Sequence, residues 1–292
     1  MHRIIYDCDN TMGLKDKDVD DGLTLMYLIG NENVELIGLT STHGNGTVEE
    51  VHENNLRIMN LLDKEYKPIF KGGDLNTGRI SEAAKFLAIS ASRYKGEITI
   101  LATGSMSNLY GAYLYDENFY KNVKNIVLMG GITKPLIISG VEVKELNLSC
   151  DYEASYSVLT SGADITILDG HVTLQALFRE KELNALKNSS NEILRYVYTE
   201  IEPWFNSMEK TFNIKAFCNW DVAAAMYITN KEIFNENFVY INPHIEELKY
   251  GIITLSEEHK GFKVNMPNKI IDLDKFNSIL IEKWENYKRS NF

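Results

Sequence analysis

Short apolar and β-branched runs alternate with amphipathic stretches along most of the chain. The runs are RIIY, NVELIGLT, EITILA, KNIVLMGG and ADITIL. Between the second and the third, TVEEVHENNLRIMNLLD opens with Thr47 and Glu50 at the spacing of a capping box, and it places Val51, Met59 and Leu62 on one helical face. Strands that alternate with helices predict an α/β fold, with a largely parallel central sheet flanked by helices on both sides.

The chain shows no internal boundary. No linker rich in Pro, Gly or Ser and no repeat divides the 292 residues, and only five prolines occur in all. We therefore predict a single domain over residues 1–292. The region of about 186–216 lacks strand character and predicts helices, which we interpret as a lid. The residues from about 247 onwards predict a pair of strands followed by a closing helix.

Composition excludes several classes of partner. A net charge of −11 argues against nucleic acid, since such binding needs clustered Lys and Arg. No apolar run approaches the ~18 residues of a membrane span, and the N-terminal apolar stretch is too short for a signal peptide. Cys8, Cys150 and Cys218 form neither a CxxC pair nor an even-numbered disulfide framework. We predict a cytoplasmic protein that binds neither membrane nor nucleic acid.

Polar segments follow several of the predicted strands at the point where each strand ends. DCDN follows the first run, STHGNGT the second, TGSMSN the run ITILA, and GGIT the run IVLM. In a parallel α/β sheet, ligands gather beyond the carboxyl ends of the strands. These four segments are therefore expected to share one crevice.

Six aspartates fall between residues 7 and 21, and carboxylates so close together repel one another unless something positive lies among them. Asp7 and Asp9 are two positions apart, so both face one side if the strand continues. Asp20 and Asp21 head GLTLMYLIGN, which predicts a buried helix, and the helix dipole alone favours acids in a first turn. Four carboxylates brought together nevertheless indicate a cation site.

The expected cation is a hard one. Oxygen donors without His or Cys suit Ca²⁺ or Mg²⁺, and DCDNTMGLKDKD lacks the fifth-position Asp and the terminal Glu of an EF-hand loop. Asp16 and Asp18 alternate with Lys15 and Lys17, a pattern that predicts a solvated, self-neutralising loop. We therefore expect Asp16 and Asp18 to be surface charges rather than ligands.

The stretch IIYDCDNT resembles two enzyme families. It is similar to the DxDxT opening of haloacid dehalogenase-type phosphatases, but the late strand ITILDGHVT offers only Asp169 to the magnesium motif of that family. It also resembles the D-x-D-P-G-x-D-D signature of nucleoside hydrolases, with a six-residue insert, Leu14 to Val19, before Asp20. Further similarity to this second family follows in order along the chain, from about residue 3 to about 230, in LTSTHGN, LATGSMSNL, IVLMGG, ELNLSCDYEAS and NWDVAAAMYI.

The resemblance to nucleoside hydrolases implies hydrolysis of the N-glycosidic bond of ribonucleosides to free base and ribose, as in nucleoside salvage, with one Ca²⁺ in an α/β fold with a Rossmann-like core. It implies that calcium is held by Asp9, Asp21, Asp221 and the backbone carbonyl of Thr103, and that Asp9 is the catalytic base for a calcium-bound water. Asp7 would support these groups from behind. The implied contacts of the nucleoside are Asp20, Asn45, Met129, Glu145 and Asn147. Family habit suggests a homodimer or homotetramer.

The chain departs from the family pattern where the base leaves. Trp220 stands where well-studied branches carry a histidine, and Ser139 lies near the place of a further ribose-binding asparagine. Either the base leaves while stacked on an aromatic ring, Trp220 or Trp204, or a proton comes from Cys218, a tyrosine near 198 or Glu202. The alternatives to an active hydrolase are a catalytically weak homologue that binds ribose or nucleosides and, less favoured, a magnesium-dependent DxDxT phosphohydrolase led by Asp7.

Overall fold

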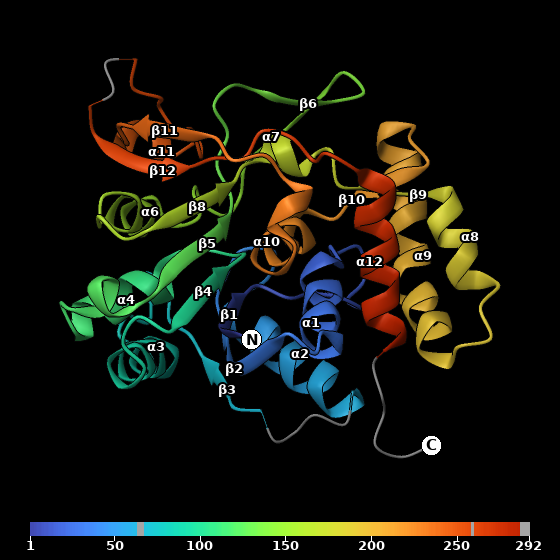
Figure 1. Cartoon of the computed structure of the whole chain (residues 1–292), viewed down its shortest axis with the longest axis horizontal. Coiled ribbons are helices and arrows are strands. Elements are labelled where there is room, and N and C mark those ends of the chain that lie inside the picture. Colours follow the sequence, from blue (N-terminus) through green and yellow to red (C-terminus); the bar gives the residue numbers. More distant parts are fainter. Residues whose placement is uncertain (63–66, 258–259, 287–292) are drawn as a thin grey trace.

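The fold is built on a mainly parallel sheet, which Figure 1 shows crossing the molecule. The structure is a computed structural model that describes residues 1–62, 67–257 and 260–286. Within these residues, eight strands form the main sheet in the order β11-β12-β8-β5-β4-β1-β2-β3, and every neighbouring pair is parallel except β11 with β12. The strands of this sheet are β1 (His2–Cys8), β2 (Val34–Ser41), β3 (Ile69–Lys71), β4 (Ile98–Ala102), β5 (Asn125–Met129), β8 (Ile165–Leu168), β11 (Phe238–Ile241) and β12 (Phe262–Asn265). The predicted α/β fold is confirmed.

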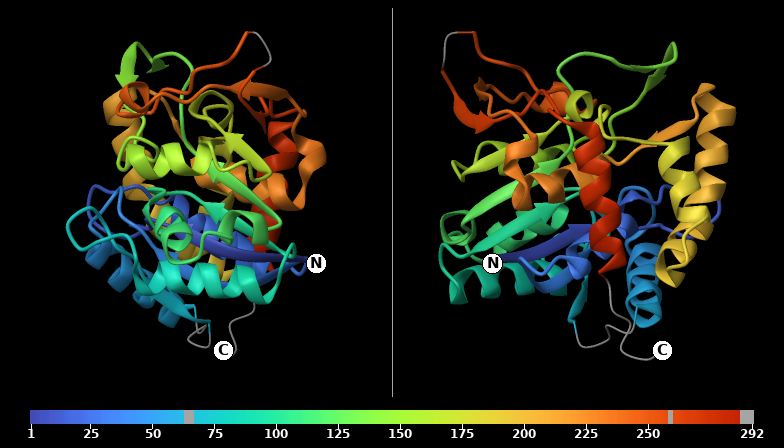
Figure 2. Two further views of the ribbon diagram at one scale, coloured as in Figure 1. Left: turned by 90° about the vertical axis from the view of Figure 1, so that its left-hand side faces the viewer. Right: turned by 45° about the vertical axis from the view of Figure 1, so that its right-hand side comes forward.

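Helices cover both faces of the sheet. In Figures 1 and 2, α3, α4 and α6 lie on one face and α1, α2, α10 and α12 on the other, with α8 and α9 outermost on that second side. The longer helices are α1 (Asp20–Gly30), α2 (Val48–Leu61), α3 (Glu82–Arg93), α4 (Ser107–Tyr115), α6 (Tyr152–Leu159), α8 (Glu180–Lys187), α9 (Glu192–Phe212), α10 (Trp220–Thr229) and α12 (Leu273–Glu285). The short ones are α5 (Phe119–Asn122), α7 (Gly170–Thr173), η1 (Lys231–Ile233) and α11 (Ile245–Leu248). Two small pairs complete the structure, β6 (Leu136–Ile138) with β7 (Val141–Val143) and β9 (Leu177–Arg179) with β10 (Ala216–Cys218).

The alternation of side chains along the strands produces two cores. In β1, Ile4 and Tyr6 belong to the core beneath α1, α10 and α12, whereas Ile5 belongs to the core on the opposite face. Helix α1 is buried along almost its whole length because it packs against both α10 and α12. A helix that is apolar all round belongs in an interior. Its first turn, with two aspartates, is thereby carried into the protein.

Other local predictions have mixed outcomes. The capping box of α2 is present, with the N–H of Glu50 donating to Thr47 Oγ1 at 3.2 Å. The region 186–216 is mostly helical, although β10 begins at Ala216. Helix α9 packs into the core through Leu194, Val197, Ile201 and Phe205. In the tail, β12 and α12 are confirmed, but the partner strand of β12 is β11, which precedes the predicted pair. The chain turns at Gly251, where φ is 69°, and residues 252–255 form only isolated bridges.

No helix in the described part of the chain is long and apolar enough to cross a membrane.

Candidate functional site

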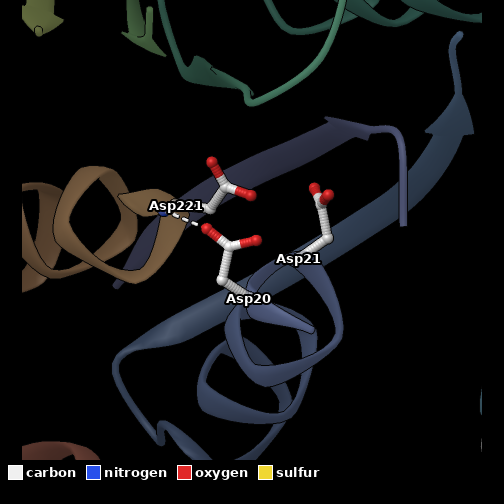
Figure 3. A group of neighbouring side chains, drawn as sticks. All are labelled: Asp20, Asp21 and Asp221. Atoms are coloured by element: carbon white, nitrogen blue, oxygen red, sulfur yellow. Dashed lines mark hydrogen bonds between the residues drawn. The ribbon is translucent and has the colours of Figure 1, made fainter. Parts of the chain in front are cut away.

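Three buried carboxylates meet where two helices begin. Asp20 and Asp21 lie in the first turn of α1, and Asp221 lies in the first turn of α10. One oxygen from each lies within 4.8 Å of the other two, and Figure 3 shows the three side chains turned toward a common space. The N–H of Asp221 donates to Asp20 Oδ2 at 3.1 Å and ties the two helix ends together. The side chains are 2–3 % exposed, so water screens their mutual repulsion poorly.

Asp9 lies beside this trio, at the end of β1. Its carboxylate is fully buried, and Asp9 Oδ2 accepts from the backbone N–H of Asn45 at 2.5 Å. The approach of the Asn45 loop requires a glycine, since a Cβ on Gly44 would lie 1.9 Å from Asp9 Oδ2. Asp9 is therefore held in place by the loop after β2.

Neutral donors orient the other predicted residues. Asp21 Oδ1 accepts from Tyr6 OH at 2.9 Å and from Thr103 Oγ1 at 2.7 Å. Asn147 Nδ2 donates to the carbonyl oxygen of Thr103 at 3.1 Å and to that of Met129 at 3.0 Å. These bonds join the ends of β1, β4 and β5, which is the convergence predicted from the strand order.

The charge distribution of the cluster favours a bound cation. Burial, and then the neighbouring carboxylates, raise the pKa values of Asp20, Asp21 and Asp221 well above the usual range, and burial also raises the pKa of Asp9. The one basic side chain among the residues that line the adjoining cavity, Lys144, is exposed. A set of oxygen donors without nitrogen or sulfur fits a hard divalent cation, and the residues present therefore fit the metal that the sequence predicted. The trio of carboxylates includes Asp20, whereas the metal ligands predicted from the sequence include Asp9 instead. Both Asp9 and Asp20 lie beside Asp21.

A cavity of about 200 Å³ opens above the trio. Its lining contains eight of the residues predicted for metal or substrate: Asp20, Asn45, Thr103, Met129, Glu145, Asn147, Trp220 and Asp221. Two predicted residues do not line the cavity: Asp21, which belongs to the trio, and Asp9, which lies beside Asp21. Glu145 Oε1 accepts from the N–H groups of Gly131 at 3.0 Å and Leu148 at 2.8 Å, so backbone donors fix this carboxylate.

Asp18 corrects one expectation from the sequence. It was predicted to be a surface charge, but it lines the cavity, and burial raises its pKa to about 6. Lys17 Nζ donates to the backbone carbonyl of Asn45 at 2.5 Å, which holds the insert against the loop after β2. Asp16 does lie at the surface, with its side chain 80 % exposed.

One wall of the cavity was not predicted. The β6–β7 hairpin and the residues after it contribute Leu136, Val143, Lys144 and Leu146. A local signature was available, since Ser139 and Gly140 form the turn with φ values of 48° and 83° between apolar residues, as in a tight hairpin. Ser139 is thus a turn residue, and it does not line the cavity.

The structure does not bring the other suggested proton donors to the cavity. Cys218 is buried with its Sγ 3.9 Å from the carbonyl oxygen of Leu174, and Tyr198 OH donates to Glu202 on α9. Trp204 lines a separate cavity between α9 and the insert. None of the histidines in the described ranges lines the site cavity. Trp220 is the aromatic residue among the lining side chains.

Asp7 is enclosed behind the site. Its Oδ1 accepts from Thr40 Oγ1 at 2.6 Å and from Asn108 Nδ2 at 2.8 Å, and burial raises its pKa to about 7. It is fully buried and does not line the cavity, so no phosphorylated nucleophile is presented there. This geometry suits a supporting position, and it gives the phosphohydrolase interpretation no support.

Comparisons with known proteins give one consistent result. The family model described as inosine-uridine preferring nucleoside hydrolase matches residues 4–278. The chain is 28 % identical over 212 residues to a probable uridine nucleosidase 1 of Oryza sativa subsp. japonica, a match that covers 62 % of this chain and 64 % of that relative, just under two thirds of its length. It is 21 % identical to the inosine-uridine preferring nucleoside hydrolase of Crithidia fasciculata over 97 % of both chains. A solved plant nucleoside hydrolase has the same fold, with a TM-score of 0.85 at 20 % identity over 97 % of this chain and 98 % of the other.

Proposed function

We infer that this chain, which belongs to the inosine-uridine preferring nucleoside hydrolase family, hydrolyses the N-glycosidic bond of ribonucleosides to free base and ribose. The observation that carries this proposal is the buried carboxylate cluster at the base of a cavity lined by eight of the residues expected to hold metal or substrate. Relatives named as uridine nucleosidase and inosine-uridine preferring nucleoside hydrolase support the same chemistry.

Asp9 is proposed as the general base. Its carboxylate is buried, is held by the Asn45 N–H, and adjoins the floor of the cavity. Accepting the proton of the attacking water there would contribute about 10² to 10⁴ in rate, as for other positioned bases. The sugar acquires positive charge at the transition state of glycosidic cleavage, and the surrounding carboxylates stabilise that charge.

We propose Ca²⁺ as the metal, held by Asp9, Asp21, Asp221 and the carbonyl oxygen of Thr103, with Asp20 close enough to take part. When bound, such an ion lowers the pKa of water and offsets the mutual repulsion of the carboxylates. The Thr103 carbonyl already accepts one bond from Asn147, and a carbonyl oxygen has a second lone pair to offer.

The nucleoside is proposed to lie with its ribose toward the floor of the cavity and its base toward the mouth. Asp20, Asn45, Asn147 and Glu145 offer hydrogen-bonding groups for the hydroxyls. Met129 and Trp220 provide apolar and aromatic surface, and stacking a base on Trp220 would contribute roughly 1 to 3 kcal/mol. The β6–β7 hairpin excludes water from one side.

Three further proposals come from the sequence. The protein acts in the cytoplasm on a small-molecule substrate, a location that suits its three free cysteines. It assembles as a homodimer or homotetramer. Helix α9 forms part of a lid, and it faces the insert across the second cavity.

The test is release of ribose from adenosine, inosine, uridine and cytidine, measured as reducing sugar. Wild-type protein should release ribose from at least one of them, and Asp9→Asn should lower kcat by about 10² or more. Nucleoside binding in a calorimeter without product over hours would instead support the alternative, a binding homologue that has lost turnover. Neither binding nor product from any nucleoside would refute both.

A further inference from the structure

The insert, Leu14 to Val19, contributes Asp18 to the lining of the cavity, and two hydrogen bonds hold the end of the insert that carries Asp18. Thr11 Oγ1 donates to the carbonyl oxygen of Asp18 at 3.1 Å, and Lys17 Nζ donates to the carbonyl oxygen of Asn45 at 2.5 Å. Asp18 Oδ1 accepts from the N–H of Val19 at 2.7 Å. These contacts leave the carboxylate of Asp18 on the cavity side of the loop, where it is part of the lining.

Asp18 lies beside Asp20, and its charge is one of the causes that raise the pKa of Asp20. Asp18 is partly exposed, whereas Asp20 and Asp221 are 2 % and 3 % exposed. The same cavity contains Trp220. If the ribose hydroxyls reach the trio, the base extends toward Asp18 and Trp220. An aromatic face and a carboxylate together form a favourable environment for a cation, because both attract positive charge.

This environment opposes the departure of a neutral base. When the C1′–N bond breaks, its electron pair goes to the nitrogen, and a neutral base leaves with negative charge unless it is protonated. Among the described residues, no histidine lines the cavity to supply that proton, and the carboxylate of Asp18 repels the growing negative charge. Lys144, the cation among the lining residues, belongs to the segment after the opposite hairpin and is exposed.

We propose that Asp18 is a specificity-determining residue, and that with Trp220 it selects nucleosides whose base carries a positive charge when it leaves. This rests on the proposed hydrolase function. A permanently cationic base, such as a pyridinium or an N7-alkylated purine, takes the electron pair of the C1′–N bond and leaves neutral. Water adds its oxygen to C1′, and Asp9 accepts the released proton. No proton donor to the base is required.

The experiment compares two pairs of substrates: 7-methylguanosine with guanosine, and 3-carbamoylpyridinium riboside with uridine. For each pair, kcat/KM is measured with wild type, Asp18→Asn and Asp16→Asn. The asparagine at 18 keeps a carbonyl oxygen for the N–H of Val19, so the loop is preserved. Asp16 lies in the same insert with its side chain 80 % exposed, and it serves as the matched control. Comparing ratios between variants cancels the greater intrinsic reactivity of cationic nucleosides.

We expect the ratio of kcat/KM for the cationic over the neutral substrate to fall about tenfold in Asp18→Asn, the size of one lost favourable charge contact, and to be unchanged in Asp16→Asn. An equal ratio in wild type and Asp18→Asn would overturn the proposal while leaving the hydrolase function intact. So would a greater loss for guanosine and uridine, which would make Asp18 a proton donor to neutral bases. Absence of ribose from all four substrates, with release from adenosine, inosine or cytidine, would overturn this proposal alone. Absence of ribose from those three nucleosides as well would overturn the proposed function.

Discussion

Replacing Asp21 with Asn should stabilise the metal-free protein. The side chain is 2 % exposed, and one of its oxygens lies within 4.8 Å of oxygens of Asp20 and Asp221. Two unit charges at that separation repel by about 3 kcal/mol at an effective dielectric constant near 20. Asp21 faces two such neighbours, but partial protonation of the carboxylates reduces the total repulsion. The free energy of unfolding at pH 8 should therefore rise by about 3 kcal/mol in Asp21→Asn, rather than by twice that amount. The asparagine keeps an oxygen for the hydroxyls of Tyr6 and Thr103.

The assay is thermal unfolding at pH 8, in a chelator and in millimolar Ca²⁺. In the chelator, Tm of Asp21→Asn should exceed that of wild type by roughly 6 to 12 °C. In Ca²⁺, wild type should gain stability in proportion to the logarithm of metal concentration, and the variant should gain little. Asp16→Asn, at an exposed position, should behave as wild type in both conditions. A lower Tm for Asp21→Asn in the chelator would refute the claim that the cluster is held under repulsion.

Three other outcomes follow from the structure. Gly44→Ala places a Cβ 1.9 Å from Asp9 Oδ2 and should lower kcat by about tenfold to a hundredfold, because it displaces that carboxylate. Gly46→Ala is the control, since its Cβ would meet the nearest atom at 3.3 Å, and its kcat should stay near that of wild type. Equal losses of kcat in the two variants would contradict this role of Gly44. Trp220→Ala should raise KM for nucleosides by about tenfold, with Trp220→Phe between the two, and an unchanged KM would exclude stacking on this ring. In a chelator, the Asp7 pKa of about 7 means that the folded state retains a proton that the unfolded chain loses near pH 4, so stability is present at low pH and is lost as pH rises toward 7. Between about pH 4 and pH 7, the free energy of unfolding of wild type should therefore fall by up to about 4 kcal/mol relative to that of Asp7→Asn, as measured by denaturant titration. The same pH dependence of this free energy in both proteins would contradict the raised pKa of Asp7.

The parts of the fold that could be predicted from sequence are those with strong local patterns. Five of the eight strands in the main sheet are long apolar runs, and their order with helices implied a parallel sheet. The strand β3 (Ile69–Lys71) has three residues, too few to show a period. The partner of β12 was misplaced because the chain between Leu248 and Leu255 has apolar residues in a turn rather than a strand.

The candidate site divides in the same way. Residues that follow the strands could be assigned to the site from the sequence, because the carboxyl ends of parallel strands all lie at one edge of the sheet. Asp16 and Asp18 could not be told apart, since both alternate with lysines and share the same local pattern. Asp18 faces the cavity because Lys17 bonds to a carbonyl 28 positions away, a tertiary contact that no local pattern specifies. The inward position of the segment after β7 likewise depends on packing.

Hydrolysis is proposed to depend on a divalent cation that the buried carboxylates hold. The most direct test of this dependence is the rate of ribose release from the best nucleoside substrate, measured in chelator and then after addition of Ca²⁺ in excess. We expect the chelator to abolish the rate, Ca²⁺ to restore it in wild type, and Asp21→Asn to remain inactive after Ca²⁺ is added. A rate that persists unchanged in the chelator would contradict this dependence.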